Sequence, residues 1–212
     1  MTPHRLLVLG ASGGTGRALV SQALDAGHVV TAIVRDPSRL SIASERLHVI
    51  TGEVTTDEAL LARAMHDQEV VICALGAGKS FKSNDLIATV IPRLVKAMQN
   101  SGVRRLIHTS AFGVGGTYAD TPILARIFMK LLLGDITRDK EAGEVAIRAS
   151  DLDWTVVYPT GLSDRPASGT YRTGEHLPLT GFPTISRADV ANFLLKQADD
   201  TTFYRKGVLV AS

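Results

Sequence analysis

The chain has 212 residues, of which 45% are hydrophobic and 21% are charged, and this length fits one folded domain. Its formal net charge of +2 comes without a dense basic stretch, so the composition argues against nucleic-acid and membrane-surface partners. No apolar run approaches the roughly 18 residues that a membrane span needs. The single cysteine excludes an internal disulfide, so we expect a cytoplasmic protein.

Short apolar runs alternate with amphipathic stretches along the whole chain. The apolar runs have the length of buried parallel strands, and the longer stretches have the spacing of helices. Strands that alternate with helices predict an α/β fold: a single doubly wound Rossmann-type domain, with a mainly parallel sheet and helices on both faces. In chain order we predict strand 5–10, helix 14–26, strand 29–34, strand 48–52, helix 57–66, strand 70–75, helix 84–100, strand 105–110, helix 137–149, strand 154–158, helix 186–197 and strand 208–211.

Two segments do not fit this alternation. Residues 164–183 are rich in Gly, Pro, Thr and Arg, and we predict a long surface loop there. Residues 122–134 (PILARIFMKLLLG) are the most apolar helix candidate, as a wall of a substrate pocket, part of the core or a contact with a second subunit. We expect one domain over residues 1–212, with a small substrate-side portion from about 160 to 212, in a monomer or weak homodimer.

A glycine-rich loop joins the first predicted strand to the first predicted helix, with the sequence Gly10-Ala11-Ser12-Gly13-Gly14-Thr15-Gly16. In this setting Gly10 permits a tight turn, Gly13 lets a pyrophosphate approach the backbone, and Gly16 lets the helix pack closely. The helix N-terminus presents free N–H groups to the phosphates, and Ser12 and Thr15 add hydroxyl donors. The strand–loop–helix context predicts a dinucleotide-binding loop, and the alternative is a structural turn without a ligand.

The end of the second predicted strand indicates which dinucleotide is bound. Arg35 stands where NAD-binding domains usually carry an acidic residue for the ribose 2′-hydroxyl. Its planar guanidinium suits a 2′-phosphate, and Arg39 adds positive charge nearby. We therefore predict NADP(H), with NAD(H) as the second choice because Asp36 follows directly. The alternative for Arg35 is an exposed charge without a ligand.

Six segments in one order carry a resemblance to a known family: GASGGTGR at 10–17, AIVRDPSRL at 32–40, GEV at 52–54, ALGAG at 74–78, HTSAFG at 108–113 and ISRADVA at 185–191. Together they resemble the atypical short-chain dehydrogenase/reductase group, over nearly the whole chain. Within that group the sequence is similar to biliverdin-IX-beta reductases, which are also flavin reductases, and to NmrA-like proteins.

The resemblance implies a cofactor path along the carboxyl ends of the strands, where doubly wound sheets bind their ligands. It places residues 53–54 beside the adenine, although the family usually has Asp where Glu53 stands. It places residues 75–76 along the cofactor, residues 109–111 at the nicotinamide and residues 158–160 just beyond. These residues are Glu53, Val54, Leu75, Gly76, Thr109, Ser110, Ala111, Tyr158, Pro159 and Thr160.

The wider superfamily moves a proton with a Tyr-x-x-x-Lys pair, which this sequence lacks. Lys140 falls in the expected helix, but Ile136 stands four residues before it. Biliverdin-IX-beta reductases also lack that tyrosine, and such enzymes can deliver hydride to an acceptor that water protonates. Lys140 either joins Asp139 and Glu141 in a surface charge cluster or reaches the cofactor ribose. Ser110 is the candidate catalytic residue, to align substrate or nicotinamide, and its alternative is an ordinary loop serine.

The remaining chemistry-bearing residues point away from metal catalysis. The six histidines show no metal-ligand spacing, so we predict no metal site, and we expect His108 and Cys73 to be core residues. We expect an NAD(P)H-dependent reductase that transfers hydride to a planar conjugated acceptor, such as a flavin, quinone or tetrapyrrole. Two alternatives stay open: a non-catalytic NADP-binding sensor of NmrA-like type, and an NAD(P)-dependent epimerase or dehydratase.

Overall fold

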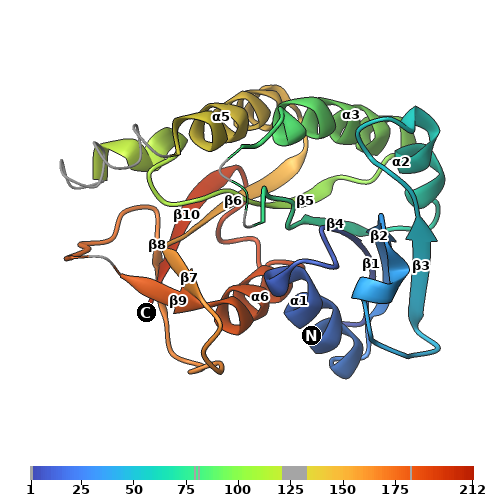
Figure 1. Ribbon diagram of the computed structural model, residues 1–212, viewed down its shortest axis with the longest axis horizontal. Helices are drawn as coiled ribbons and strands as arrows, with labels where there is room; N and C mark the ends of the chain where they lie inside the picture. The colour runs from blue at the N-terminus through green and yellow to red at the C-terminus, as the bar shows by residue number, and fades with distance from the viewer. Residues whose placement is uncertain (1, 79, 81, 121–132, 182) are drawn as a thin grey trace.

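Three layers make up the computed structural model, which describes residues 2–78, 80, 82–120, 133–181 and 183–212. The helices are α1 (Gly14–Asp25), α2 (Glu58–Ala64), α3 (Leu86–Ser101), α5 (Gly134–Ala149) and α6 (Arg187–Lys196), with short 3-10 turns at Pro37–Arg39 and Gly115–Asp120. Figure 1 shows α2, α3 and α5 on one face of a central sheet and α1 and α6 on the other. This arrangement confirms the predicted doubly wound fold with helices on both faces.

The main sheet is parallel except at one edge. Its strands are β1 (Arg5–Leu9), β2 (Val29–Val34), β3 (Leu47–Thr51), β4 (Val70–Cys73), β5 (Arg105–Thr109), β6 (Asp153–Pro159), β8 (Arg172–Gly174) and β10 (Lys206–Ala211). Their order is β3-β2-β1-β4-β5-β6-β10-β8, with only β8 antiparallel to its neighbour. The order reverses between β1 and β4, which places a ligand crevice at the carboxyl ends of these two strands.

The segment that we predicted as a long surface loop, residues 164–183, contains the strand β8, which pairs with β10 at the sheet edge. On either side of the segment, β7 (Gly161–Ser163) and β9 (Thr184–Ser186) pair with each other in a separate parallel ladder. The prediction of a long surface loop was wrong for Arg172–Gly174, because a strand of three residues carries too little alternation to be recognised. The apolar segment 122–134 lies outside the described residues except for its last two positions.

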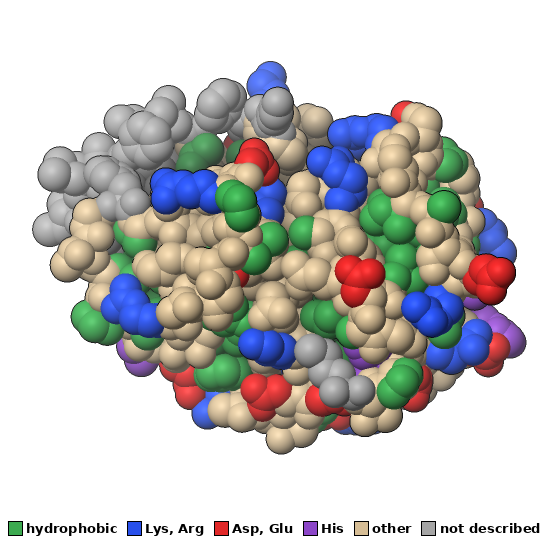
Figure 2. All heavy atoms as spheres, turned by 90° about the horizontal axis from the view of Figure 1, so that it is seen from below, with side chains coloured by type: hydrophobic (Ala, Val, Ile, Leu, Met, Phe, Trp, Pro, Cys, Tyr) green, Lys and Arg blue, Asp and Glu red, His purple; other side chains and the backbone are tan. Residues whose placement is uncertain are grey.

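Two apolar cores fill the space between the sheet and the helices. Successive strand side chains point to opposite faces, so Leu7 and Leu9 join the core under α2 and α3, whereas Leu6 and Val8 join the core under α1 and α6. Burial on both faces explains why the strand sequences are continuously apolar. On the face of α1 and α6, acidic and basic side chains are interspersed (Figure 2). None of the described helices is long and apolar enough to cross a membrane.

The start of α3 is held by a side chain from α5. Asp85 precedes α3 with a φ of 52°, and its own side chain makes no capping hydrogen bond. Instead, the buried carboxylate of Asp139 accepts the backbone N–H groups of Ile87 at 3.1 Å and Ala88 at 2.8 Å. The two helices are therefore joined at the end of the molecule where the strands finish, because α5 and α3 both begin at that edge.

Candidate cofactor site

The glycine loop joins β1 to α1 and packs tightly against the end of β4. Gly10 has a φ of +79°, and a Cβ there would lie 2.5 Å from the carbonyl oxygen of Ala74. A Cβ on Gly16 would collide with the carbonyl oxygen of Gly10. Gly13 is exposed and occupies the N-cap position before α1 without a side-chain hydrogen bond, while Thr15 is mostly buried. The first N–H groups of α1 are thus presented to a phosphate, as the sequence predicts.

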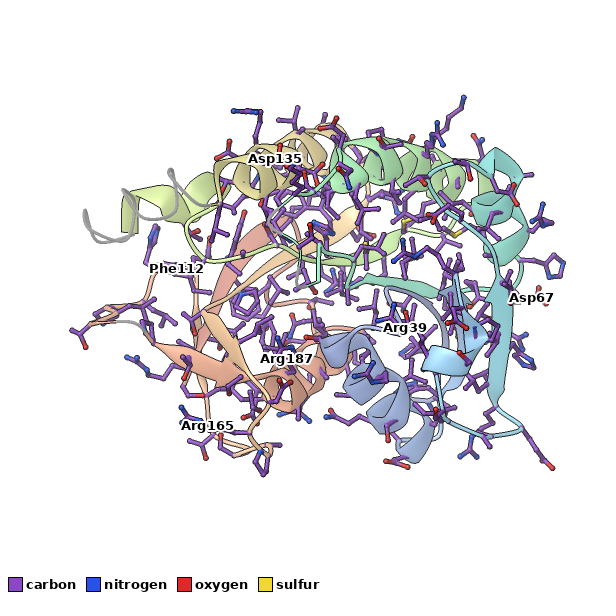
Figure 3. All side chains as sticks on the ribbon, in the orientation of Figure 1. Arg39, Asp67, Phe112, Asp135, Arg165 and Arg187 are labelled. Carbon is purple, nitrogen blue, oxygen red and sulfur yellow. The ribbon has the colours of Figure 1, made fainter. Side chains whose placement is uncertain are left out.

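Arg187 lies across the first turn of α1, a contact that the sequence did not reveal. A Cβ on Gly14 would lie 2.6 Å from Cδ and 3.0 Å from Nε of Arg187. Figure 3 shows Arg187 where α6 meets the start of α1, and its Nη1 lies 2.7 Å from Oδ1 of Asp164. A second arginine, Arg17, donates to the carbonyl oxygen of Ser12 at 2.6 Å. Two arginines therefore lie beside the loop. Arg187 belongs to the ISRADVA segment that supported the family resemblance, and this segment was the one sequence feature that could have indicated its role.

Arg35 and Glu53, two of the residues predicted on the adenine side, lie together. Arg35 is exposed, and its guanidinium is 3.7 Å from the carboxylate of Glu53. Asp36 instead caps the Pro37–Arg39 turn, where its Oδ1 accepts the N–H of Ser38 at 3.0 Å and the hydroxyl at 2.7 Å. These hydrogen bonds from Ser38 lower the pKa of Asp36. Asp36, the residue for which NAD(H) remained the second choice, therefore has its carboxylate bound to Ser38. Arg35 and the exposed Arg39 supply positive charge at this side of the site.

The predicted cofactor residues after β3 and β4 differ in how exposed they are to a ligand. Val54 is buried in the core that includes α2 and α3. Leu75 is partly exposed and Gly76 is exposed beyond the end of β4, which finishes at Cys73, two residues earlier than predicted. A Cβ on Gly76 would meet nothing within 4 Å, so the backbone there is open to a close approach. The cofactor contacts assigned to these positions stay predictions.

Lys140 is directed at the end of β5. Its Nζ donates to the carbonyl oxygen of Thr109 at 3.3 Å, and burial lowers its pKa. Lys140 and Asp139 are buried, and Glu141 alone of the predicted surface cluster is exposed, so that interpretation was wrong for the first two. The cause is that this face of α5 packs against α3 and the sheet. Ile136 stands one helical turn before Lys140, partly buried, at the position that the wider superfamily gives to tyrosine.

Ser110 and Tyr158 share a buried carboxylate that the sequence did not reveal. Ser110 Oγ donates to Glu144 Oε1 at 2.7 Å, and the hydroxyl of Tyr158 donates to Glu144 Oε2 at 2.5 Å. Arg148 Nη2 donates to the Tyr158 oxygen at 2.8 Å. Burial first, and then the charge of Glu144, raises the pKa of Tyr158. Tyr158 is 1% exposed and Ser110 is 4% exposed, so these bonds enclose the phenol and hold the Ser110 hydroxyl in one orientation. Contact of either residue with the cofactor stays a prediction.

The last two predicted cofactor residues continue the strand pairing. Pro159 accepts the N–H of Phe112 at 3.0 Å, and Thr160 donates its N–H to the carbonyl of Val210 at 3.1 Å. Thr160 is buried. Their backbone groups therefore bind neighbouring strands and loops, and contact with a nicotinamide stays a prediction for both.

Cys73 and His108 are core residues, as predicted, and they are cross-strand partners in β4 and β5. Burial raises the pKa of the Cys73 thiol to about 11, so the thiol is unreactive. In the described part of the chain no group of three or more His, Cys, Asp or Glu side chains is placed to hold a metal ion. The absence of a metal site in the whole chain stays a prediction.

Comparison with known proteins places this geometry in a family. The fold is similar to a short-chain dehydrogenase/reductase from Veillonella parvula solved in complex with NADP, with a TM-score of 0.82, 24% identity and 99% of this chain and 94% of that chain covered. It is also similar to ChuY, an anaerobillin reductase from Escherichia coli O157:H7, with a TM-score of 0.81, 22% identity and 97% and 96% covered.

An uncharacterized chloroplastic protein of Arabidopsis thaliana is 31% identical over 175 residues, which are 78% of this chain and 61% of that protein. The chain thus spans about three fifths of that relative. The family model described as NAD(P)H-binding matches residues 10–201, a range that includes the glycine loop, the strand ends and Arg187. The chain belongs to this NAD(P)H-binding family of Rossmann-type proteins.

Proposed function

We propose that the protein is an NAD(P)H-dependent reductase that transfers hydride to a planar conjugated acceptor, such as a flavin, quinone or tetrapyrrole. One observation carries the proposal: Lys140 reaches the end of β5, but the residue one helical turn before it is Ile136. The site therefore keeps the lysine of the dehydrogenase pair and lacks its phenol. ChuY, whose fold is similar, is named a reductase, which agrees with hydride transfer.

Three tyrosines, Tyr158, Tyr171 and Tyr204, have side chains that the structure describes, and none of the three offers a substitute acid at this edge. The Tyr158 hydroxyl is bound inside the core, and that of Tyr171 donates to Asn192 at 2.8 Å. The ring of Tyr204 packs under the guanidinium of Arg105, which lies at the opposite, amino end of β5. We propose that water supplies the proton, which suits acceptors whose conjugated system stabilises the electron pair they receive.

The chain's own groups bind and orient the reactants in this proposal. NADPH, when bound, supplies the hydride. The glycine loop binds the pyrophosphate, and Arg35 and Arg39 bind the 2′-phosphate, so NADP(H) is preferred to NAD(H). Lys140 and Glu144 fix the end of β5, and Ser110 there aligns the reactants. We also propose a cytoplasmic monomer or weak homodimer whose partners are small molecules, without nucleic acid or membrane.

The decisive experiment is a screen of acceptors in which NADPH oxidation is followed by absorbance. Riboflavin, a benzoquinone and a linear tetrapyrrole are the probes, and a simple ketone is the control acceptor. Turnover with a conjugated probe and none with the ketone is the expected result. Tight NADPH binding without turnover of any acceptor would contradict the proposal and favour a nucleotide sensor.

The tyrosine-independent mechanism is tested with two variants of the same network. Tyr158→Phe should keep most of kcat, because its hydroxyl is buried against Glu144 and donates no proton to substrate. Ser110→Ala should lower kcat more, by loosening the alignment at the end of β5. A lost general acid would lower kcat by a factor of about 100 or more, so a loss of that size in Tyr158→Phe would refute the mechanism.

A further inference from the structure

Arg187 carries a positive charge in a place that disfavours one. It is the first residue of α6, and its side chain also lies over Gly14 in the first turn of α1. Both helix starts carry partial positive charge, so a cation there is destabilising unless an anion accompanies it. Asp189, the acidic residue in the first turn of α6, is not the anion that accompanies Arg187. Its carboxylate accepts hydrogen bonds from Ser168, Gly169 and Ser186 instead.

The anion that accompanies Arg187 in this structure is easily replaced. Asp164 Oδ1 lies 2.7 Å from Nη1 of Arg187, but the Asp164 side chain is 87% exposed and that of Arg187 is 30% exposed. Exposed ion pairs of this kind are worth little, because water screens both charges. A pyrophosphate on the N–H groups of α1 would meet the same guanidinium with more charge and with the geometry that arginine binds in a bidentate manner.

We propose that Arg187 binds the dinucleotide pyrophosphate, and that Asp164 is a stand-in anion that the pyrophosphate displaces. The proposal rests on the cofactor binding of the family and not on the proposed reduction. Asp164 directly follows β7, and Arg187 directly follows β9, so the exchange acts where the β7–β9 ladder meets the glycine loop. A Cβ on Gly14 would displace the flexible end of the Arg187 side chain, so the missing side chain at Gly14 leaves room for Arg187 over the loop.

Binding measurements test the proposal without any turnover. Calorimetric titrations of Arg187→Ala with NADPH and with NADH should both show affinity weakened by about tenfold or more, because the pyrophosphate is common to the two. ADP-ribose, which has the pyrophosphate, should be weakened in the same way, whereas 2′-AMP, which lacks it, should not. Arg165→Ala, which removes an exposed neighbouring charge, is the matched control and should change no dissociation constant by more than twofold.

The stand-in role of Asp164 is tested in the same titrations. Asp164→Asn should leave NADPH affinity unchanged or tighten it, and in an Arg187→Ala background it should have no effect. Arg187→Lys keeps the charge without the fork, and it should weaken both dinucleotides less than Arg187→Ala does. Unchanged affinities in folded Arg187→Ala, a loss for NADPH alone, or a loss in Asp164→Asn equal to that in Arg187→Ala would each overturn the proposal.

Discussion

Three glycines of the loop, Gly10, Gly13 and Gly16, are glycine for different reasons. Gly10 adopts a left-handed φ against the backbone of Ala74, and Gly16 has no space for a side chain next to Gly10. Both are requirements of the fold. Gly13 has an ordinary φ of −74°, and a Cβ there would meet only the Gly10 carbonyl oxygen, at 3.3 Å. A side chain at Gly13 therefore obstructs a ligand more than it disturbs the fold.

Gly13→Val should abolish NADPH binding in a folded protein, because the branched side chain fills the place of the pyrophosphate. Gly16→Ala is the matched variant, and we expect it to lose about 1–3 kcal/mol of stability through overpacking. Calorimetric titration and thermal unfolding of the two variants distinguish the effects. Unchanged NADPH affinity in folded Gly13→Val would show that the loop is not the phosphate site.

Arg35→Ala should narrow the affinity gap between NADPH and NADH by about 1.5–3 kcal/mol, since only NADPH offers a 2′-phosphate to the guanidinium. Arg35 is exposed and 3.7 Å from Glu53, so its loss disturbs no core contact. Glu53→Gln is the control, because it removes that pair and leaves the guanidinium in place, and the gap should persist. Equal dissociation constants of wild type for the two cofactors would disprove this role of Arg35.

Among the elements, α5 positions the segments next to the candidate site through its buried side chains. Asp139 binds the start of α3, Lys140 binds the end of β5, and Glu144 binds Ser110 and Tyr158. The buried face of this helix is therefore strongly polar, and its partners come from several segments. Because hydrogen bonds are directional, these contacts specify one position for the helix. An apolar face would permit more than one way of packing.

Asp139→Ala should lower the free energy of unfolding by about 1–3 kcal/mol, because two backbone N–H groups at the start of α3 lose their acceptor in a buried place. Asp57→Ala is the matched control: Asp57 caps α2 through Ala59 and Leu60, but it is partly exposed, so water can replace it. We expect a smaller loss there. Urea unfolding of both variants measures the difference, and an equal loss would contradict the argument from burial.

The elements that sequence could predict are those whose signals are local. The loop from β1 into α1 follows from glycine spacing, and the parallel sheet follows from apolar runs such as β4 and β5. Bonds between distant segments could not be predicted: Ser110 and Glu144 lie 34 residues apart, and Ile87 and Asp139 lie 52 apart. Which face of α5 becomes buried depends on tertiary packing, so the carboxylate of Glu144 had no recognisable signal.

For the molecule as a whole, a buried histidine links stability to pH. His108 is fully buried, and its ring nitrogens have no hydrogen-bond partner in the described part of the chain. Burial, and then the charge of Lys140, lowers its pKa to about 3 from the usual 6.5. Below pH 6.5 His108 becomes protonated in the unfolded chain but stays neutral in the folded chain. The free energy of unfolding therefore falls as pH falls. Burial also lowers the pKa of His28, which acts in the same direction.

Between pH 7 and pH 5.5 we expect His108 alone to lower the free energy of unfolding by about 1 kcal/mol. His108→Leu removes the titrating ring and should flatten this dependence. It should cost little at pH 7, because the ring nitrogens have no hydrogen bonds to lose. Urea unfolding at the two pH values checks this, and a variant that keeps the wild-type difference would show that another group is responsible.

The burial of Cys73 has a use in measurement. It is the chain's one thiol, it lies in β4 between β1 and β5, and burial raises its pKa to about 11. Alkylating reagents attack thiolates, so a molecule is labelled only after its central strand has opened to solvent. If opening destroys the binding site, a dinucleotide at 100 times its dissociation constant raises the free energy of opening by about 2.7 kcal/mol. The rate of alkylation therefore reports cofactor occupancy from inside the sheet, with no dye attached and no acceptor known.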